Sequence, residues 1–157
     1  MRILFVCHGN ICRSPMAEFI MKDIVAKAGR ADRYEIESAA TSSEELGNPV
    51  YPPAKRMLAR HGISCPLRGA VRVQREDYAK YDLLICMDER NMVNLQRILG
   101  ADPEHKVLKL MDLTQRPRDV ADTWYTGNFD ETYEDLIEGC NALFKKLERE
   151  DAGKGEA

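Results

Sequence analysis

The chain has 157 residues, of which 44% are hydrophobic and 31% charged, and its formal net charge is −3. This length suits one domain with a single core, and the composition is typical of a globular protein. A mildly acidic chain of this kind is not expected to be a general binder of nucleic acids or of anionic membranes.

The first predicted elements are a buried strand, a loop and a helix, and they share the stretch RILFVCHGNICRSPM at the N-terminus. The apolar run Ile3–Val6 predicts the strand, and a helix is expected at Ser14–Ala28. Serine is a good N-cap and proline suits the first helical position, so the loop Cys7–Arg13 lies between a strand end and a helix start. Backbone N–H groups and the positive end of a helix dipole then point into the loop, which predicts an anion-binding site.

The rest of the chain predicts strands that alternate with helices. Later strands are expected at Tyr34–Ala39, Leu83–Met87 and Val107–Leu110. Later helices are expected at Pro53–Arg60, Glu89–Leu99 and Glu131–Arg149, with a helical turn at Glu76–Lys80. Long loops are expected at Ala40–Pro53 and Met111–Asp130, and residues 151–157 are expected to form a frayed tail after a single domain of residues 1–150. This order predicts an α/β fold with a four-stranded parallel sheet, helices on both faces and a phosphate-binding loop after the first strand.

Ligands of such sheets bind beyond the carboxyl ends of the strands, where Cys7, Asp88 and the loop after Leu110 are expected to meet. Positive surroundings favour the thiolate form of a cysteine, so Cys7 is the candidate nucleophile. The planar guanidinium of Arg13 can hold two phosphate oxygens and stays charged. A bare C-x5-R pattern is a weak signal, but the preceding strand and Gly9 within the loop strengthen it. The alternative is that Cys7 is a small buried residue at a strand end.

The cysteine content indicates the redox state and argues against a metal site. The five cysteines are odd in number and irregularly spaced, which is typical of reduced thiols rather than of a disulfide framework. There is no C-x2-C pair and there are only three histidines, so we expect no metal site. The N-terminus lacks a signal-peptide pattern, and no segment has the apolar length of a transmembrane helix. We therefore expect a cytoplasmic protein without a membrane partner.

The segment CHGNICRS, from Cys7 to Ser14, resembles the active-site signature of the low-molecular-weight protein tyrosine phosphatases. Further segments match this family in the same order along the chain. They are ESAATS (Glu37–Ser42), GNP (Gly47–Pro49), RHGI (Arg60–Ile63), CMDERN (Cys86–Asn91) and ADTWYTGNFDETY (Ala121–Tyr133). The resemblance covers nearly the whole chain, and it implies hydrolysis of phosphotyrosine in proteins without a cofactor.

The resemblance also implies a role for each site residue. Cys7 is the nucleophile that gives a phosphocysteine, and Arg13 with the loop amides holds the phosphate oxygens. Asp122 is the acid that protonates the leaving tyrosine oxygen and then the base that activates water. The implied substrate-binding residues are His8, Gly9, Asn10, Ile11, Cys12, Ser14, Trp124 and Tyr125.

Among these residues, some support the loop and others line the substrate cleft. Ser14 is expected to donate a hydrogen bond to the Cys7 sulfur, and Asn10 is expected to hold the loop backbone through Ser38. The pair Trp124–Tyr125 resembles the aromatic pair that sandwiches the phosphotyrosine ring, with simple packing as the alternative for one of the two.

The acid segment departs from the family pattern. The family has D-P-[YW], whereas this chain has Asp122-Thr123-Trp124, so one restraint on the loop backbone is missing. Asp119 is the fallback acid, although an ordinary solvated loop charge is the simpler interpretation of that residue.

Two other activities of related proteins remain as alternatives, together with a non-catalytic phosphoprotein-binding module. Relatives that act on phosphoarginine carry threonine where this chain has Ile11, so Ile11 favours phosphotyrosine. An arsenate reductase needs resolving cysteines after the third strand, but Cys86 lies inside the strand pattern and residues 88–107 contain none. A binding module needs neither a thiolate nor an acid, so the presence of Cys7 with Asp122 argues against it.

Two further residues bear on regulation and on loop support. Many family members have a cysteine at the place of Cys12, so a reversible disulfide with Cys7 is one interpretation and a small buried residue the other. The family's H-x-A-R is replaced by Arg68-Gly69-Ala70-Val71, so either a supporting histidine is missing or an arginine has taken its place. We expect phosphotyrosine proteins and a tyrosine kinase as partners, and a monomer or weak self-association.

Overall fold

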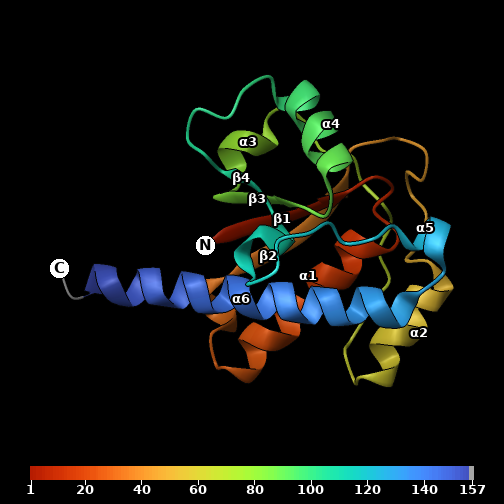
Figure 1. Cartoon of the computed structure of the whole chain (residues 1–157), viewed down its shortest axis with the longest axis horizontal. Coiled ribbons are helices and arrows are strands. Elements are labelled where there is room, and N and C mark those ends of the chain that lie inside the picture. The colour runs from red at the N-terminus through yellow and green to blue at the C-terminus, as the bar shows by residue number, and fades with distance from the viewer. Residues whose placement is uncertain (156–157) are drawn as a thin grey trace.

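The chain folds around a four-stranded parallel sheet, which Figure 1 shows in a computed structural model. The structure describes residues 1–155. The strands are β1 (Arg2–Cys7), β2 (Glu35–Ala40), β3 (Leu83–Cys86) and β4 (Val107–Lys109), in the spatial order β2-β1-β3-β4. Each neighbouring pair is parallel, so the predicted sheet is confirmed.

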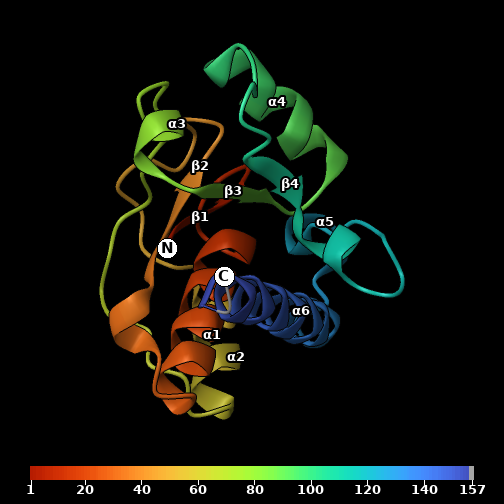
Figure 2. The same ribbon diagram turned by 90° about the vertical axis from the view of Figure 1, so that its left-hand side faces the viewer.

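Helices cover both faces of this sheet (Figures 1 and 2). On one face lie α1 (Arg13–Lys27), α2 (Pro52–Arg60) and α6 (Phe129–Gly155), and on the other lie α3 (Asp77–Lys80) and α4 (Glu89–Leu99). The short elements are the 3-10 helices η1 (Ala31–Arg33) and η2 (Leu110–Leu113) and the single turn α5 (Thr123–Thr126). No helix within residues 1–155 is both long enough and apolar enough to cross a membrane.

The central strand β1 contributes to the core on both sides of the sheet. Ile3 and Phe5 pack into the larger apolar cluster with α1 and α6, whereas Leu4 and Val6 pack into the smaller cluster with α4. A parallel strand with helices on both faces buries successive side chains on alternate sides. This burial explains why the strand is a continuous apolar run.

The start of α1 differs from the prediction. We predict Ser14 as its cap, but the helix begins at Arg13 with Cys12 as N-cap and without a side-chain capping hydrogen bond. The Ser14 hydroxyl is instead hydrogen-bonded to the Cys7 sulfur and to the Asn10 amide. The prediction is wrong because a buried hydroxyl with these two partners is no longer available to cap a helix.

Two predictions for the C-terminal part are also wrong. Met111–Asp130 is not one loop, because it contains most of η2, all of α5 and the first residues of α6. The helix α6 continues to Gly155, so Asp151–Gly155 are helical rather than frayed, and residues 156 and 157 lie outside the described residues. Once a helix is nucleated, each added residue contributes a hydrogen bond, and the ion pair between Lys146 and Glu150 supports the last turns.

Candidate active site

The loop that follows β1 holds the Cys7 sulfur in a hydrogen-bonded position. Cys7 is only 3% exposed, and its Sγ atom lies 3.0 Å from the Ser14 hydroxyl and 3.3 Å from the backbone N of Asn10. The Ser14 oxygen already accepts a hydrogen bond from the Asn10 side chain, so its own proton is free to point to the sulfur. Two donors directed at one sulfur stabilise negative charge on it, which suits a nucleophilic thiolate.

Asn10 is the residue that supports the loop from inside. It is fully buried and adopts a left-handed backbone with φ of 60°, which costs asparagine less than most residues. Its Nδ2 donates to Ser14 Oγ at 2.8 Å and to Ser38 Oγ on β2 at 3.0 Å, and Ser38 in turn donates to Glu18 at 2.6 Å. The predicted contact between Asn10 and Ser38 is confirmed.

Arg68 holds the other side of Asn10. Its Nη1 donates to the Asn10 carbonyl at 2.8 Å, and its Nη2 donates to the Asn10 side-chain oxygen. The backbone N of Val71 donates to the same side-chain oxygen at 3.1 Å. Burial lowers the pKa of Arg68, and the Glu18 carboxylate partly offsets this effect. Of the two interpretations of this departure, the structure supports the one in which an arginine supplies the support.

Arg13 lies under the loop with part of its guanidinium occupied. It is 2% exposed, and its Nη1 donates to Asp88 at 2.7 Å and to the carbonyl of Val120 at 2.8 Å. Nη2 lies 3.6 Å from Asp122, which is beyond a hydrogen bond. Burial lowers the pKa of Arg13, whereas the Cys7 charge and the Asp88 carboxylate raise it. The raising effects together outweigh burial, so the pKa of Arg13 lies above its ordinary value. Nε–H and the two Nη2–H groups have no hydrogen-bond partner within residues 1–155, so they can bind an anion.

Sequence reasoning places Asp88 at this edge of the sheet but misses its contact with Arg13. Asp88 caps α4, with Oδ1 accepting from the backbone N of Asn91 at 2.8 Å. The other oxygen binds Arg13. Asn91 also accepts from the backbone N of Met87 and of Asp88, which fixes the direction of the strand end. The Asp-x-x-Asn capping pattern was the signal, but it does not show which distant cation the carboxylate meets.

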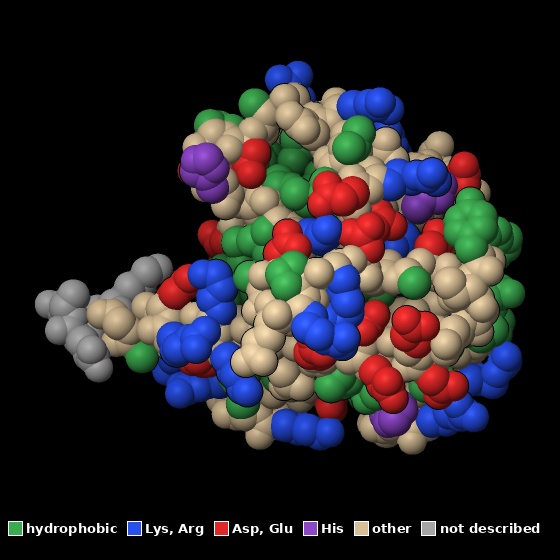
Figure 3. All heavy atoms as spheres, in the orientation of Figure 1, with side chains coloured by type: hydrophobic (Ala, Val, Ile, Leu, Met, Phe, Trp, Pro, Cys, Tyr) green, Lys and Arg blue, Asp and Glu red, His purple; other side chains and the backbone are tan. Residues whose placement is uncertain are grey.

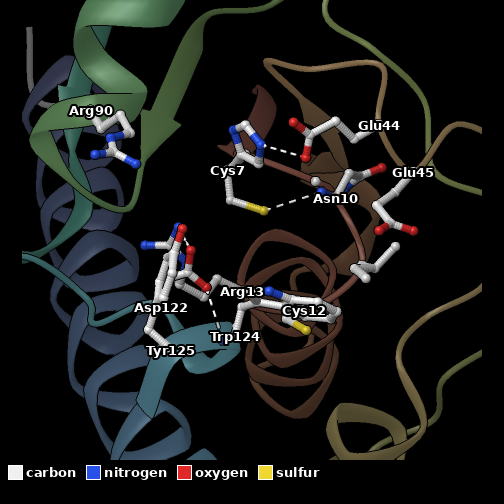
Figure 4. A pocket seen from close by; sticks show the side chains of 13 residues that line it. Cys7, Asn10, Cys12, Arg13, Glu44, Glu45, Arg90, Asp122, Trp124 and Tyr125 are labelled. Carbon is white, nitrogen blue, oxygen red and sulfur yellow. Dashed lines mark hydrogen bonds and ion pairs between the residues drawn. The ribbon is translucent and has the colours of Figure 1, made fainter. Parts of the chain in front are cut away.

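The predicted residues meet around one pocket of about 340 Å³ (Figure 4). It is lined by Cys7, His8, Gly9, Asn10, Ile11, Cys12, Arg13, Glu44, Glu45, Arg90, Asp122, Trp124 and Tyr125. Ser14, which we also predict, is not in the lining but lies fully buried beneath the loop. Glu44, Glu45 and Arg90 were not predicted, because nothing in their local sequence marks them as rim residues. Glu44 lies 2.9 Å from the His8 ring nitrogen.

The candidate acid and the aromatic pair come from α5, across the pocket from the loop (Figure 4). Asp122 caps α5 through a hydrogen bond from the backbone N of Trp124 at 3.0 Å. Trp124 and Tyr125 are 64% and 78% exposed, so their rings are available to an arriving substrate. The fallback acid Asp119 does not line this pocket and is hydrogen-bonded to Lys109 at 2.8 Å. Between the two acids, Asp122 is the one that borders the site.

The two cysteines of the loop form no disulfide in the structure. Cys7 and Cys12 are both free and buried. Burial raises the pKa of Cys12 to about 12, with smaller contributions from Cys7 and Asp122. Cys12 is therefore a neutral thiol near pH 7. Cys86 is fully buried in β3, and burial raises its pKa as well. Within residues 1–155, no group of three or more metal-binding side chains is assembled.

Known proteins resemble this chain along most of its length. The pattern described as low molecular weight phosphotyrosine protein phosphatase matches residues 2–153. The chain belongs to this phosphatase family. The phosphatase is 36% identical over 150 residues to the low molecular weight protein-tyrosine-phosphatase YfkJ of Bacillus subtilis. This match covers 94% of this chain and 96% of YfkJ. It is 34% identical over 150 residues to the rat low molecular weight phosphotyrosine protein phosphatase. That match covers 92% of this chain and 94% of the rat protein.

Solved structures of relatives have the same fold as this phosphatase. The crystal structure of YfkJ matches with a TM-score of 0.91 at 35% identity, and the match covers 96% of each chain. The structure of DARP, a Drosophila arginine phosphatase, matches with a TM-score of 0.85 at 26% identity, covering 94% of this chain and 98% of that one. Relatives are named protein-tyrosine phosphatases, so the chain is an enzyme of the hydrolase class.

Proposed function

We propose that this phosphatase hydrolyses phosphotyrosine in proteins through a phosphocysteine intermediate. The observation that carries the proposal is the convergence of Cys7, Arg13 and Asp122 on one pocket whose mouth bears two exposed aromatic side chains. The thiol supplies a nucleophile, the guanidinium an anion clamp and the carboxyl group a proton. An aromatic mouth suits the flat ring of phosphotyrosine.

In the first step, the Cys7 thiolate attacks phosphorus, and the bond between phosphorus and the tyrosine oxygen breaks. The free N–H groups of Arg13 and the loop amides hold the equatorial oxygens while charge spreads over them. Asp122 gives its proton to the departing phenolate, which is a poor leaving group because its parent pKa is about 10.

In the second step, water attacks the phosphocysteine, and Asp122 takes the proton from that water. The bond between sulfur and phosphorus breaks, inorganic phosphate forms and Cys7 returns to the thiolate. The Ser14 hydroxyl, 3.0 Å from Sγ, stabilises the departing sulfur in this step.

The nature of the substrate is tested with matched peptides. We expect release of phosphate from phosphotyrosine peptides without added metal, and no release by the Cys7→Ser variant. Phosphoarginine and phosphoserine peptides are measured in parallel, because the fold is shared with an arginine phosphatase. Faster Cys7-dependent release from phosphoarginine would replace phosphotyrosine as the substrate, and the absence of any Cys7-dependent release would contradict the proposal.

The role of Asp122 is tested by Asp122→Asn. The amide cannot donate the proton, so we expect kcat/KM for an unactivated aryl phosphate to fall by about 10²–10⁴-fold, the usual contribution of a general acid. Asp130→Asn is the matched control, because Asp130 is an exposed carboxylate at the start of α6 and does not line the pocket. Near-normal turnover by Asp122→Asn would remove Asp122 from the mechanism.

A further inference from the structure

Lys109 is a lysine with little solvent exposure at the edge of the sheet that carries the active site. It is the last residue of β4, where it pairs with Cys86 of β3, and it is 8% exposed. The carboxyl ends of β1 and β3 lie at the same edge, and Lys109 does not line the active-site pocket.

The ammonium group of Lys109 binds carboxylates from different segments. Nζ donates to Glu89 Oε1 at 2.9 Å in the first turn of α4 and to Asp119 Oδ1 at 2.8 Å. Asp112 of η2 lies 3.9 Å away. The hydrogen bonds to Asp119 and then to Glu89 raise the pKa of Lys109, so it stays charged throughout the ordinary pH range. One lysine therefore joins α4, η2 and the loop before α5.

The segment tied down by Lys109 leads directly to the candidate acid. Val120, the neighbour of Asp119, is fully buried, and its backbone N donates to the carbonyl of Met87 at 2.8 Å. The carbonyl of Val120 accepts from Arg13 at 2.8 Å, and Asp122 follows two residues later. Asp119 is thus joined to Asp122 by a short stretch of backbone that is hydrogen-bonded at Val120.

The same loop is attached on its other side by Arg118. Nη2 of Arg118 lies 2.7 Å from Asp135 and 3.2 Å from Glu138, both on α6. Adjacent side chains of one loop therefore bind α6 and the sheet edge. Residues 114–122 contain no helix or strand, and Thr123 has no ring to fix its φ as proline would. The ion pairs of Arg118 and Asp119 therefore hold this segment together with the hydrogen bonds of Val120.

We propose that Lys109, through Asp119, is a positioning residue that sets Asp122 for proton transfer. The inference rests on the proposed function, in which Asp122 is the general acid. The carboxylates of Asp119 and Glu89 are 47% and 69% exposed, and such pairs contribute little to the free energy of unfolding. Their effect on activity is separate from stability, because a misplacement of about 1 Å can cost up to about 100-fold in rate.

The test compares two substrates that differ in their need for an acid. Phenyl phosphate releases a poor leaving group that needs a proton, whereas an aryl phosphate with strongly electron-withdrawing substituents releases a phenolate that leaves without one. For Lys109→Met we expect kcat/KM to fall about tenfold on phenyl phosphate and less than about twofold on the activated ester. Asp119→Asn removes the same pairing from the exposed side and is expected to have the same selective effect.

The matched control is Lys106→Met, which removes another largely buried lysine near β4. Lys106 binds the carbonyl of Tyr78 at 2.7 Å and Glu104 at 3.4 Å, both away from the acid loop. We expect it to leave the ratio of the two kcat/KM values unchanged. Lys109→Arg keeps the charge, so its kcat/KM on phenyl phosphate is expected to stay close to the wild-type value.

The double variant Lys109→Met/Asp122→Asn shows whether Lys109 acts through the acid. We expect its kcat/KM on phenyl phosphate to equal that of Asp122→Asn alone. An equal loss of kcat/KM on both substrates in Lys109→Met would overturn the inference. A lower kcat/KM in the double variant than in Asp122→Asn would do the same. If the wild-type protein hydrolyses neither ester, or Asp122→Asn shows no selective loss, the proposed function itself fails. If Asp122→Asn is selective and Lys109→Met is not, only the role of Lys109 fails.

Discussion

Asn10 shows how one side chain can organise a binding loop. Its amide nitrogen donates to Ser14 and Ser38, and its oxygen accepts from Arg68 and from the backbone of Val71. The side chain is fully buried, so each of these bonds matters more than it would in water. Aspartate could not donate these hydrogen bonds, and a larger residue would not accept the left-handed backbone readily.

We predict that Arg68→Met weakens the support of the loop and the binding of phosphate to it. The Asn10 carbonyl loses the Arg68 donor, while the side-chain oxygen keeps the Val71 N–H, and a buried unsatisfied acceptor costs about 1–3 kcal/mol. Since about 1.4 kcal/mol corresponds to tenfold in rate, a cost of this size at the transition state lowers kcat/KM by about 5- to 150-fold. The Kd for inorganic phosphate should rise in parallel, and both values are measured at fixed ionic strength.

The control for Arg68 is Arg56→Met on the neighbouring helix α2. Arg56 is exposed and lies outside the active-site pocket, so its loss should leave kcat/KM unchanged. Wild-type phosphate affinity in Arg68→Met would show that the arginine does not support the loop.

Among the elements, α6 has a close contact at Gly139 that its sequence does not predict. Gly139 lies in the middle of this helix, where a Cβ atom would lie 2.6 Å from Leu110 Cγ and 3.0 Å from Met111 Sδ in η2. The glycine therefore permits the close approach of α6 to the segment that follows β4. Its helical backbone has no need of glycine, so only the packing explains it.

We predict that Gly139→Ala destabilises the protein although alanine is the better helix former. Overpacking costs about 1–3 kcal/mol, which exceeds the helix-propensity gain of about 0.5–1 kcal/mol. Urea unfolding should show a lower midpoint with an unchanged m value.

Gly153→Ala in the same helix is the matched control, because no atom lies within 4 Å of the added Cβ. We expect it to be neutral or slightly stabilising. A Gly139→Ala protein as stable as wild type would mean that η2 shifts without cost.

Across the whole molecule, the formal net charge is −3, so no general attraction of anions to the surface is expected. Figure 3 shows acidic and basic side chains interspersed over the face drawn, without one large basic region. The active-site pocket is lined by two arginines, Arg13 and Arg90, beside the carboxylates of Glu44, Glu45 and Asp122. Anion binding is therefore expected to be local and to act on stability through linkage.

We predict that inorganic phosphate raises Tm of the whole protein. At about 100 times Kd, a ligand of the folded state adds about 2.7 kcal/mol to the free energy of unfolding. For a chain of this size, Tm rises by roughly 2–4 °C for each kcal/mol.

Sodium chloride at the same ionic strength is the control for the phosphate shift. In Arg13→Lys the shift should shrink, because an ammonium lacks the planar fork that holds two oxygens. An equal shift from chloride, or in Arg13→Lys, would place the bound phosphate elsewhere.

The sequence by itself determined the features that depend on neighbours along the chain. The apolar run before Cys7, the Gly9-containing loop and the residues that open α1 are contiguous, so their spacing predicts a strand, an anion loop and a helix start. The pairing of that loop with a late acid segment came from motif resemblance, and the pocket brings the two together.

Only the tertiary structure decided which side chains support these parts. Arg68 meets Asn10 across 58 positions, and Lys109 meets Glu89 across 20, because loops and strand ends converge at one edge of the sheet. Ser14 was misassigned as a cap for the same reason, since its buried partner Cys7 competes for the hydroxyl. Such contacts depend on topology and side-chain direction, which no local pattern contains.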